Sequence, residues 1–268
     1  MQVWACFLAA LALTAGRAAA ADLTEPASRA FADYVTKAQS AFVDRAMRPS
    51  SDRGESAVRR DETPLTRPGG GDGILDVPGG LIHHWRGEIF IPGVTLDRVI
   101  AVSRAYHDYP AIYRPVSAAT VLSEDKGVVR VQFRMRSSAG GLSATLDVRT
   151  RVEYVRVDER RAHSVSFAEE IREVKDPGRP NERRLPEGHD SGYLWRAHTL
   201  THFVAEKDGV FIAMETLGLS RQFPPLTGWI IEPIARRLGR KSVEGSLDEF
   251  LTAIRRSAAL PAPKAACA

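Results

Sequence analysis

Apolar and polar residues alternate over most of the chain between residues 117 and 221. In the stretch VVRVQFRM, Val129, Val131 and Phe133 fall on one side of an extended segment, with mostly polar residues on the other. Short polar turns such as EDKG and DERR separate such stretches. Alternation with a period of two and short turns predicts a run of antiparallel strands. The expected strands are residues 117–124, 128–137, 142–157, 161–174, 193–206 and 209–221.

One more strand and two small helices precede this run. Residues 81–91 (LIHHWRGEIFI) have the composition of a strand, which a Pro-Gly pair ends. Helical periodicity follows, with Thr95 as the candidate N-cap of a first helix. Asp108 precedes a Tyr-Pro pair and is the candidate cap of a second short helix, because proline favours the first helical turn.

Apolar residues recur at helical spacing near both ends of the chain. Residues 25–47 predict an amphipathic helix whose apolar face consists of Phe31, Tyr34, Val35, Ala38 and Phe42. We expect this helix to pack on the main domain. A helix for a partner or a membrane surface is the alternative, although its polar face mixes acidic and basic residues. Residues 225–257 predict a long C-terminal helix, which Pro233 bends.

The first residues predict an export signal. The apolar run WACFLAALALTAG is too short to span a bilayer, and it ends in small residues that suit cleavage near Ala20 or Ala21. An anchor formed by an uncleaved helix is the alternative. Residues 49–75 are rich in Arg, Ser, Pro, Gly and acidic side chains without an apolar period, which is typical of a linker or a mobile loop.

The expected organisation follows from these segments. Residues 1–21 form a signal peptide, and the mature protein is periplasmic or secreted. Residues 22–48 form the N-terminal helix, 49–75 the linker and 76–257 the main domain. Residues 258–268, rich in alanine and proline, form a disordered tail.

Charge and cysteine content narrow the classes of function. The formal net charge of +4 falls by one, to +3, when Arg17 leaves with the signal, and a charge so small and dispersed does not indicate nucleic-acid binding. Cys6 also leaves, so that Cys267 is the single cysteine of the mature chain and no internal disulfide forms. The hydrophobic core alone must then hold the exported protein together.

The order of these elements resembles the helix-grip fold of the START-like and polyketide-cyclase-like (SRPBCC) superfamily. The resemblance covers roughly residues 76–257, and its most typical segments are RGEIFIPGVTLDRVIAVSRAYHDYPAIYRPV and GWIIEPIARRL. The chain is also similar to an exported bacterial group with the same N-terminal helix. The resemblance implies an α+β fold, in which a curved antiparallel sheet of about seven strands wraps around a long C-terminal helix, with an extra N-terminal helix. It also implies a mostly apolar cavity between sheet and helix.

Alternation within residues 81–91 assigns their side chains to two faces. The more apolar set is placed inward and consists of Leu81, His83, Trp85, Gly87, Ile89 and Ile91. The outward set includes His84, Arg86 and Glu88. Since the adjacent histidines point to opposite faces, they do not form a metal site.

Aromatic residues complete the candidate binding surface. Tyr106, Tyr109 and Tyr113 recur at three- and four-residue spacing, and Tyr193 and Trp195 alternate along an expected strand. Aromatic rings with polar tips suit an amphipathic ligand, although the same rings would also fill a core. The candidate ligand-binding residues are His83, Trp85, Ile89, Tyr109, Tyr113, Tyr193 and Trp195.

No catalytic, metal-binding or cofactor-binding residue is assigned. His198 and His202 of HTLTH lie on an expected strand, where their imidazoles would stand about 13 Å apart, so we interpret them as polar residues of the outer sheet face. The stretch GHDSG at 188–192 is interpreted as a loop turn, because adjacent His, Asp and Ser side chains do not converge as a triad requires.

Charged residues of the strands leave two interpretations open. They are Asp147, Arg149, Arg151, Glu153, Glu169, Glu170, Arg196 and Glu215. Cross-strand ion pairs on a solvated face explain them. The alternative is a buried Arg–Glu pair in the cavity, which could bind a ligand carboxylate. A change of strand register by one residue would move these side chains from the solvated face to the cavity face, so both interpretations stay open.

Three functions are compatible with these patterns. The favoured one is an exported binding or carrier protein for a hydrophobic or amphipathic small molecule, with transient membrane contact allowed. The second is a cyclase- or hydrolase-like enzyme in the same cavity, with His83 as base and Tyr109 or Tyr113 as acid. The third is a non-catalytic scaffold that contacts a protein partner through the N-terminal helix and residues 175–192.

Overall fold

The computed structural model describes residues 21–47, 65–66, 73–139, 142–222 and 245–257. The expected signal peptide, most of the linker, the first part of the C-terminal helix and the tail lie outside these residues. Residues 245–257 are helical, as expected for the end of the C-terminal helix.

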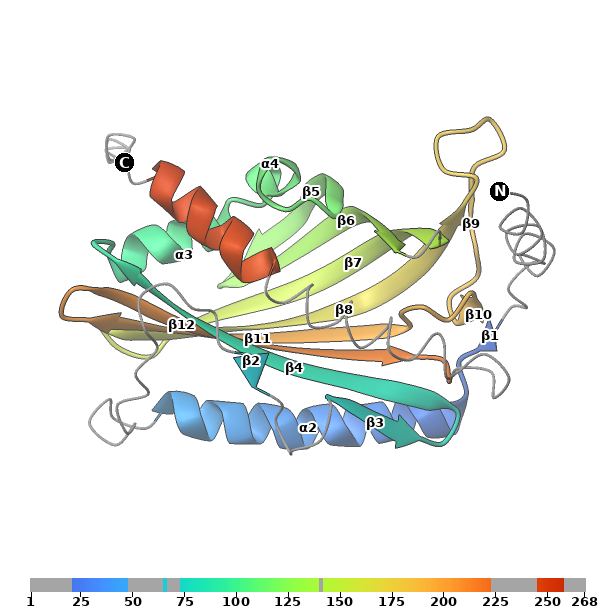
Figure 1. The fold of residues 1–268 in the computed structure, drawn as a ribbon, viewed down its shortest axis with the longest axis horizontal. Coiled ribbons are helices and arrows are strands. Elements are labelled where there is room, and N and C mark those ends of the chain that lie inside the picture. Colours follow the sequence, from blue (N-terminus) through green and yellow to red (C-terminus); the bar gives the residue numbers. More distant parts are fainter. Residues whose placement is uncertain (1–20, 48–64, 67–72, 140–141, 223–244, 258–268) are drawn as a thin grey trace, which may run out of the picture.

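Ten strands of the described segments form one antiparallel sheet, as the alternating pattern predicts (Figure 1). Their order is β2-β4-β12-β11-β8-β7-β6-β5, with β3 beside β4 and β9 beside β8. The strands are β2 (Leu65–Thr66), β3 (Ile74–Val77), β4 (Gly80–Pro92), β5 (Val116–Asp125), β6 (Val128–Ala139), β7 (Leu142–Arg156), β8 (Arg161–Lys175), β9 (Arg183–Arg184), β11 (Arg196–Glu206) and β12 (Gly209–Ser220). A separate pair joins β1 (Ala21–Asp22) to β10 (His189–Asp190). Because β4 pairs with β12, the first and last long strands lie side by side.

Helices cover both faces of the sheet (Figure 1). The outer face carries α2 (Glu25–Met47). The inner face, toward which the sheet curves, carries α3 (Leu96–Arg104), the 3-10 turn η2 (Tyr106–Asp108), α4 (Tyr109–Ile112) and helix 245–257. α3 begins as predicted, because Oγ1 of Thr95 accepts a hydrogen bond of 3.3 Å from the backbone N–H of Arg98. An α+β fold with a curved sheet beneath a C-terminal helix is confirmed.

Each face of the sheet has its own hydrophobic core. The inner core joins β4 to α3 and helix 245–257, and consists of Trp85, Ile89, Ile91, Leu96, Val99, Val102, Ala162, Phe203, Val210, Ile212, Leu247, Phe250 and Ile254. The outer core lies beneath α2 and consists of Ala27, Phe31, Phe42, Ile82, Trp195, Leu200, Leu217 and Leu219. The expected packing of the amphipathic helix on the main domain is therefore what the structure shows.

Two expected boundaries differ from the structure. β3 begins at Ile74 and pairs with β4, so the sheet includes residues that the sequence assigned to the linker. The polar stretch 175–192 contains β9 and β10 and is tied to the sheet. Polar residues of this stretch pair with charged residues on the strands. One example is Arg184, whose Nε donates a hydrogen bond of 2.6 Å to Asp147 of β7.

Replacing Phe42 with alanine should loosen α2 from the sheet. Phe42 is 3% exposed, and its ring meets the imidazoles of His163 and His202 edge-on at centroid distances of 6.3 Å. Loss of these contacts should lower the free energy of unfolding by about 3 to 4 kcal/mol in urea denaturation. The control Ser40→Ala, on the exposed side of α2, should change it by less than about 0.5 kcal/mol. Equal effects of the two substitutions would contradict the docking of α2 through Phe42.

Candidate functional site

Small side chains line the middle of the inner face. Strand register places Thr216 of β12 beside Trp85 of β4, Thr199 of β11 beside Thr216, and Ser166 of β8 beside Thr199. The next row holds Gly87, Met214, Thr201 and Ser164. The small residues of these two rows, termed the floor, are Gly87, Ser164, Ser166, Thr199, Thr201 and Thr216. Buried positions usually carry large apolar side chains, whereas the floor carries small ones.

The floor offers hydroxyl groups that no other described residue engages. Its serine and threonine hydroxyls make no hydrogen bond within the described part of the chain. Ser166, Thr199, Thr201 and Thr216 are half-buried, and Ser164 is buried. Because a hydroxyl both donates and accepts hydrogen bonds, the floor is suited to bind oxygen atoms of a molecule that lies on it.

Aromatic residues stand at both ends of the floor. At the β4 end, the indole of Trp85 is buried against Gly73, where a Cβ would come within 2.9 Å of the ring. Beyond the other end, the ring of Tyr109 lies 5.1 Å from that of Tyr106 and 4.8 Å from that of Tyr113. The three- and four-residue spacing thus brings the three tyrosines together.

Hydrogen bonds tie this tyrosine cluster to the end of α3. Tyr154, which lies opposite Ser164 of the floor, and Tyr109 both donate to the backbone oxygen of Ser103, over 2.8 and 2.7 Å. The hydroxyls of Tyr106 and Tyr154 are 3.1 Å apart. Burial raises the pKa of Tyr106 and of Tyr109, so both phenols stay neutral. The hydroxyls of Tyr109 and Tyr154 hold the end of α3 in place.

His83 lies on the inner face and contacts a serine. Nε2 of His83 lies 2.8 Å from Oγ of Ser220. Burial lowers the pKa of His83 to about 4, so its imidazole is neutral near pH 7. No contact among the described residues joins His83 to Tyr109 or Tyr113, and the base and acid considered from the sequence are not brought together.

Three of the other candidate binding residues share the inner core, and Tyr193 does not. Trp85 and Ile89 are buried in the inner core, and Tyr113 packs against it. Tyr193 is 40% exposed and precedes β11.

The expected position of Trp195 on the surface shared with Trp85 is wrong. Trp195 is buried in the outer core beneath α2, and its indole Nε1 donates to Asp190 over 3.1 Å. The reason is that β11 begins only at Arg196, so the alternation of that strand does not extend back to Trp195.

The floor was not among the features expected from the sequence. Thr199 and Thr201 alternate on one strand, and Ser164 and Ser166 alternate on another. This period-two repeat of small hydroxyl residues was the available signal. Only the register of the strands shows that the two repeats lie side by side.

A charged network is buried on the outer face, beneath α2. Glu215 is 1% exposed, and Arg45 of α2 donates to its carboxylate over 2.5 Å. Nε2 of His84 lies 3.1 Å from the other carboxylate oxygen, and Nδ1 of His84 lies 3.0 Å from the hydroxyl of Tyr34. Arg86 adds a second guanidinium, 3.9 Å from the Glu215 carboxylate.

This network bears on two expectations from the sequence. A buried Arg–Glu pair exists, but it lies beneath α2 and not in a cavity of the inner face. His84 and Glu88 do face outward as expected, yet both are buried, and Tyr34 of α2 packs against His84. Burial alone would raise the pKa of Glu215, but the hydrogen bond from His84 and the positive charges of Arg45 and Arg86 hold the pKa below its usual range.

Three further histidines lie on the outer face. His163 of β8 pairs directly with His202 of β11, and the ring of His198 is stacked on Phe167 at 6.4 Å. The outer-face position expected for His198 and His202 is confirmed, although both are buried. Within the described segments, no group of three or more His, Cys, Asp or Glu residues is placed to hold a metal ion.

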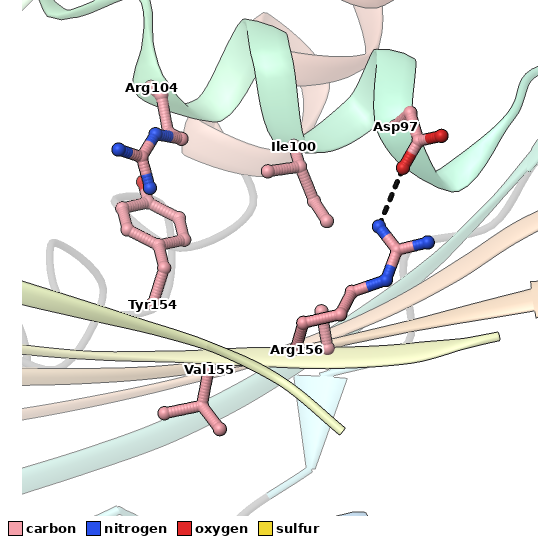
Figure 2. Close-up of a pocket in the computed structure, with 7 residues that line it drawn as sticks. Asp97, Ile100, Arg104, Tyr154, Val155 and Arg156 are labelled. Carbon is pink, nitrogen blue, oxygen red and sulfur yellow. Dashed lines mark hydrogen bonds and ion pairs between the residues drawn. The ribbon is translucent and has the colours of Figure 1, made fainter. Parts of the chain in front are cut away.

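A cavity of about 380 Å³ lies between α3 and the end of β7 (Figure 2). Its lining consists of Asp97, Ile100, Arg104, Tyr154, Val155, Arg156 and Ala162. Arg156 donates to Asp97 over 2.6 Å, and the guanidinium of Arg104 lies 4.8 Å from the centre of the Tyr154 ring. Since Tyr154 is the strand neighbour of Ser164, the cavity adjoins the floor at its β7 end.

Several solved structures are similar to this chain. A protein of Thermus thermophilus has 15% identity over 65% of this chain and 98% of its own, with a TM-score of 0.47. A STAR-related lipid transfer protein fragment of Xanthomonas axonopodis has 16% identity over 73% and 99%, with a TM-score of 0.44. The Zhui aromatase/cyclase of a Streptomyces species has 13% identity over 66% and 96%, with a TM-score of 0.42. No family model and no curated protein matches the chain.

A STAR-related protein and an aromatase/cyclase are thus among the similar structures, as the resemblance of the sequence pattern predicts. None of the helices in the described segments combines the length and the apolar character needed to cross a membrane.

Acidification should destabilise the protein through His198. Burial lowers the pKa of His198 from its usual 6.5 to about 4. The unfolded chain therefore takes up a proton here at a higher pH than the folded chain, and stability falls as the pH drops through this interval. His198→Leu should remove about 2 kcal/mol of this loss, measured by urea unfolding at about pH 7 and about pH 4.5.

His107 provides the matched control for this substitution. Its side chain is 81% exposed, so His107→Leu should leave the pH dependence of stability unchanged. An identical pH dependence in the wild type and in His198→Leu would contradict a neutral, buried imidazole at His198.

Proposed function

We propose that the protein binds a hydrophobic or amphipathic small molecule on the floor of its inner face. The observation that carries this proposal is the set of half-buried hydroxyls at the centre of the sheet, where a core would hold large apolar side chains. Aromatic residues bound the floor, with Trp85 at one end and Tyr154, whose hydroxyl lies beside that of Tyr106, at the other.

The chemistry of the floor supports this class of ligand. None of its residues carries a charge, and its neighbours in the inner core are apolar. An apolar molecule would gain about 25 cal/mol for each Å² removed from water. Oxygen atoms on it would supply hydrogen bonds to the floor hydroxyls, and such bonds fix orientation in sites that are otherwise apolar. Lipids, isoprenoids and polyketide-like molecules combine these properties.

A carrier role outside the cytoplasm is the second part of the proposal. The N-terminal apolar run with its small-residue ending supports export. An apolar molecule has low solubility in the aqueous space that it would cross, and a binding protein would shield it from water.

Export should leave a processed N-terminus near Ala21. The protein expressed in a bacterial host is expected in the periplasmic or secreted fraction, where N-terminal sequencing and intact mass would identify the cleavage site. A full-length chain recovered from the cytoplasm would contradict the carrier role, while the binding function would stand.

Larger side chains on the floor should block binding without unfolding the protein. Ser166→Leu and Thr199→Leu place apolar bulk where the ligand is proposed to lie. Each should weaken binding of a fluorescent long-chain alcohol by about tenfold or more, measured by titration. Thr120→Leu, at an exposed position of β5, should leave the affinity unchanged. Melting temperatures of all three variants show whether the fold is kept.

Protein purified from its native host provides an independent test. Native mass spectrometry should show an added mass that organic solvent extracts. If neither a co-purified molecule nor binding of the alcohol is found, the floor is not a binding site and the proposal fails.

A further inference from the structure

We propose that the cavity between α3 and β7 binds an anionic head group, a carboxylate or a phosphate, of the molecule whose apolar part lies on the floor. This inference rests on the proposed function and adds the charge and the orientation of the ligand. The cavity, of about 380 Å³, has the size of a small-molecule site.

Arg104 provides the first anchor for the anion. Its guanidinium is held over the ring of Tyr154, and its side chain is 30% exposed. Among the described residues, its only hydrogen bond runs from Nη2 to Glu124, so that Nε and Nη1 remain to donate to a ligand. A planar guanidinium in a fixed position suits the bidentate binding of carboxylate or phosphate.

The ion pair of Arg104 with Glu124 does not block this role. The side chain of Glu124 is 56% exposed. Ion pairs that are open to solvent contribute little, because water screens both charges. A ligand anion within the cavity would be less screened and would compete successfully for the guanidinium.

Arg156 provides the second anchor, at the other end of the cavity (Figure 2). Its guanidinium donates to Asp97 over 2.6 Å, and to the backbone oxygens of Asp158 and Glu159 over 2.9 and 3.1 Å. Two of these acceptors are neutral, and Asp97 is 81% exposed. Two guanidinium groups and one carboxylate line the cavity, so the lining has a net charge of +1 and favours an anion.

The surface between the arginines is apolar and leads to the floor. Ile100 projects from α3 toward the sheet between Arg104 and Arg156 (Figure 2). Ala162 lies on the sheet side of the cavity, beside Phe203 of the inner core. An acyl chain that starts at the arginines would therefore meet apolar side chains first and the floor hydroxyls next.

Paired ligands separate recognition of the head group from binding of the chain. Laurate and methyl laurate share an acyl chain and differ in charge, and their affinities follow from displacement of the fluorescent alcohol. We expect the wild type to bind laurate about tenfold more tightly, as the loss of one hydrogen bond to a charged group predicts. Arg104→Gln should abolish this preference and leave the affinity for methyl laurate unchanged.

Arg130→Gln is the matched control. Arg130 is an exposed arginine of β6 that is paired with Glu169, outside the cavity lining, and its replacement should keep the preference for laurate. If Arg104→Gln lowers the melting temperature strongly, Arg156→Gln serves as the second variant and should reduce the same preference.

Each outcome decides between the two proposals. Equal affinities of the wild type for laurate and methyl laurate overturn the head-group site and leave the proposed function standing. Binding of neither laurate, methyl laurate nor the alcohol overturns both. A preference for laurate that survives Arg104→Gln and Arg156→Gln also overturns the site. Inorganic phosphate and dodecyl phosphate share the anionic group and differ in the apolar chain. If the wild type binds both with equal affinity, the site binds a free anion and the proposed role of the apolar chain is overturned.

Discussion

Each long strand of this protein has to supply two buried surfaces, because successive side chains of a strand point to opposite faces. On β4, Trp85 and Ile89 belong to the inner core, whereas Ile82 and His84 lie beneath α2. Apolar contacts on the outer face add to those of the inner core. With the sheet held from both sides, the centre of the inner face can carry small hydroxyl residues that contribute little to stability.

Charge fixes the position of α2 on the sheet. Apolar contacts alone would allow α2 to pack at several positions along the sheet, because they are not directional. The buried carboxylate of Glu215 lies at one point of the sheet and so selects one of these positions. Without partners it would be an uncompensated buried charge, which costs several kcal/mol, roughly 3 to 5 when one partner is removed. Arg45 approaches this carboxylate from the helix and His84 from the sheet, and Tyr34 adds its hydroxyl to the imidazole. Correct docking is therefore the arrangement in which all these groups are satisfied.

The sequence predicted the strands well, because alternation with a period of two is a local property of the chain. It placed Trp85 and Ile89 on the correct face, since pairing with β12 continues along β4 without interruption. It failed for Trp195, which precedes its strand. It placed His84 correctly on the outward face but did not show that a helix buries it there. What covers the second face of a sheet depends on residues far apart in the chain, and local alternation carries no information about it. The same holds for the floor, which exists only once β8, β11 and β12 are in register.

The position of α2 in the chain also has a consequence for how the protein is made. Arg45 and its partner Glu215 are 170 residues apart, and the surface that receives the helix is complete only when β12 has been added. Ribosomes add about 5 to 20 residues per second, so Glu215 is synthesised on the order of ten seconds after Arg45. Contacts across such a separation form slowly, since the intervening chain must first lose its freedom. Although α2 precedes the long strands in the chain, it is thus among the last of the described elements to be secured. Until then its apolar side chains stay uncovered.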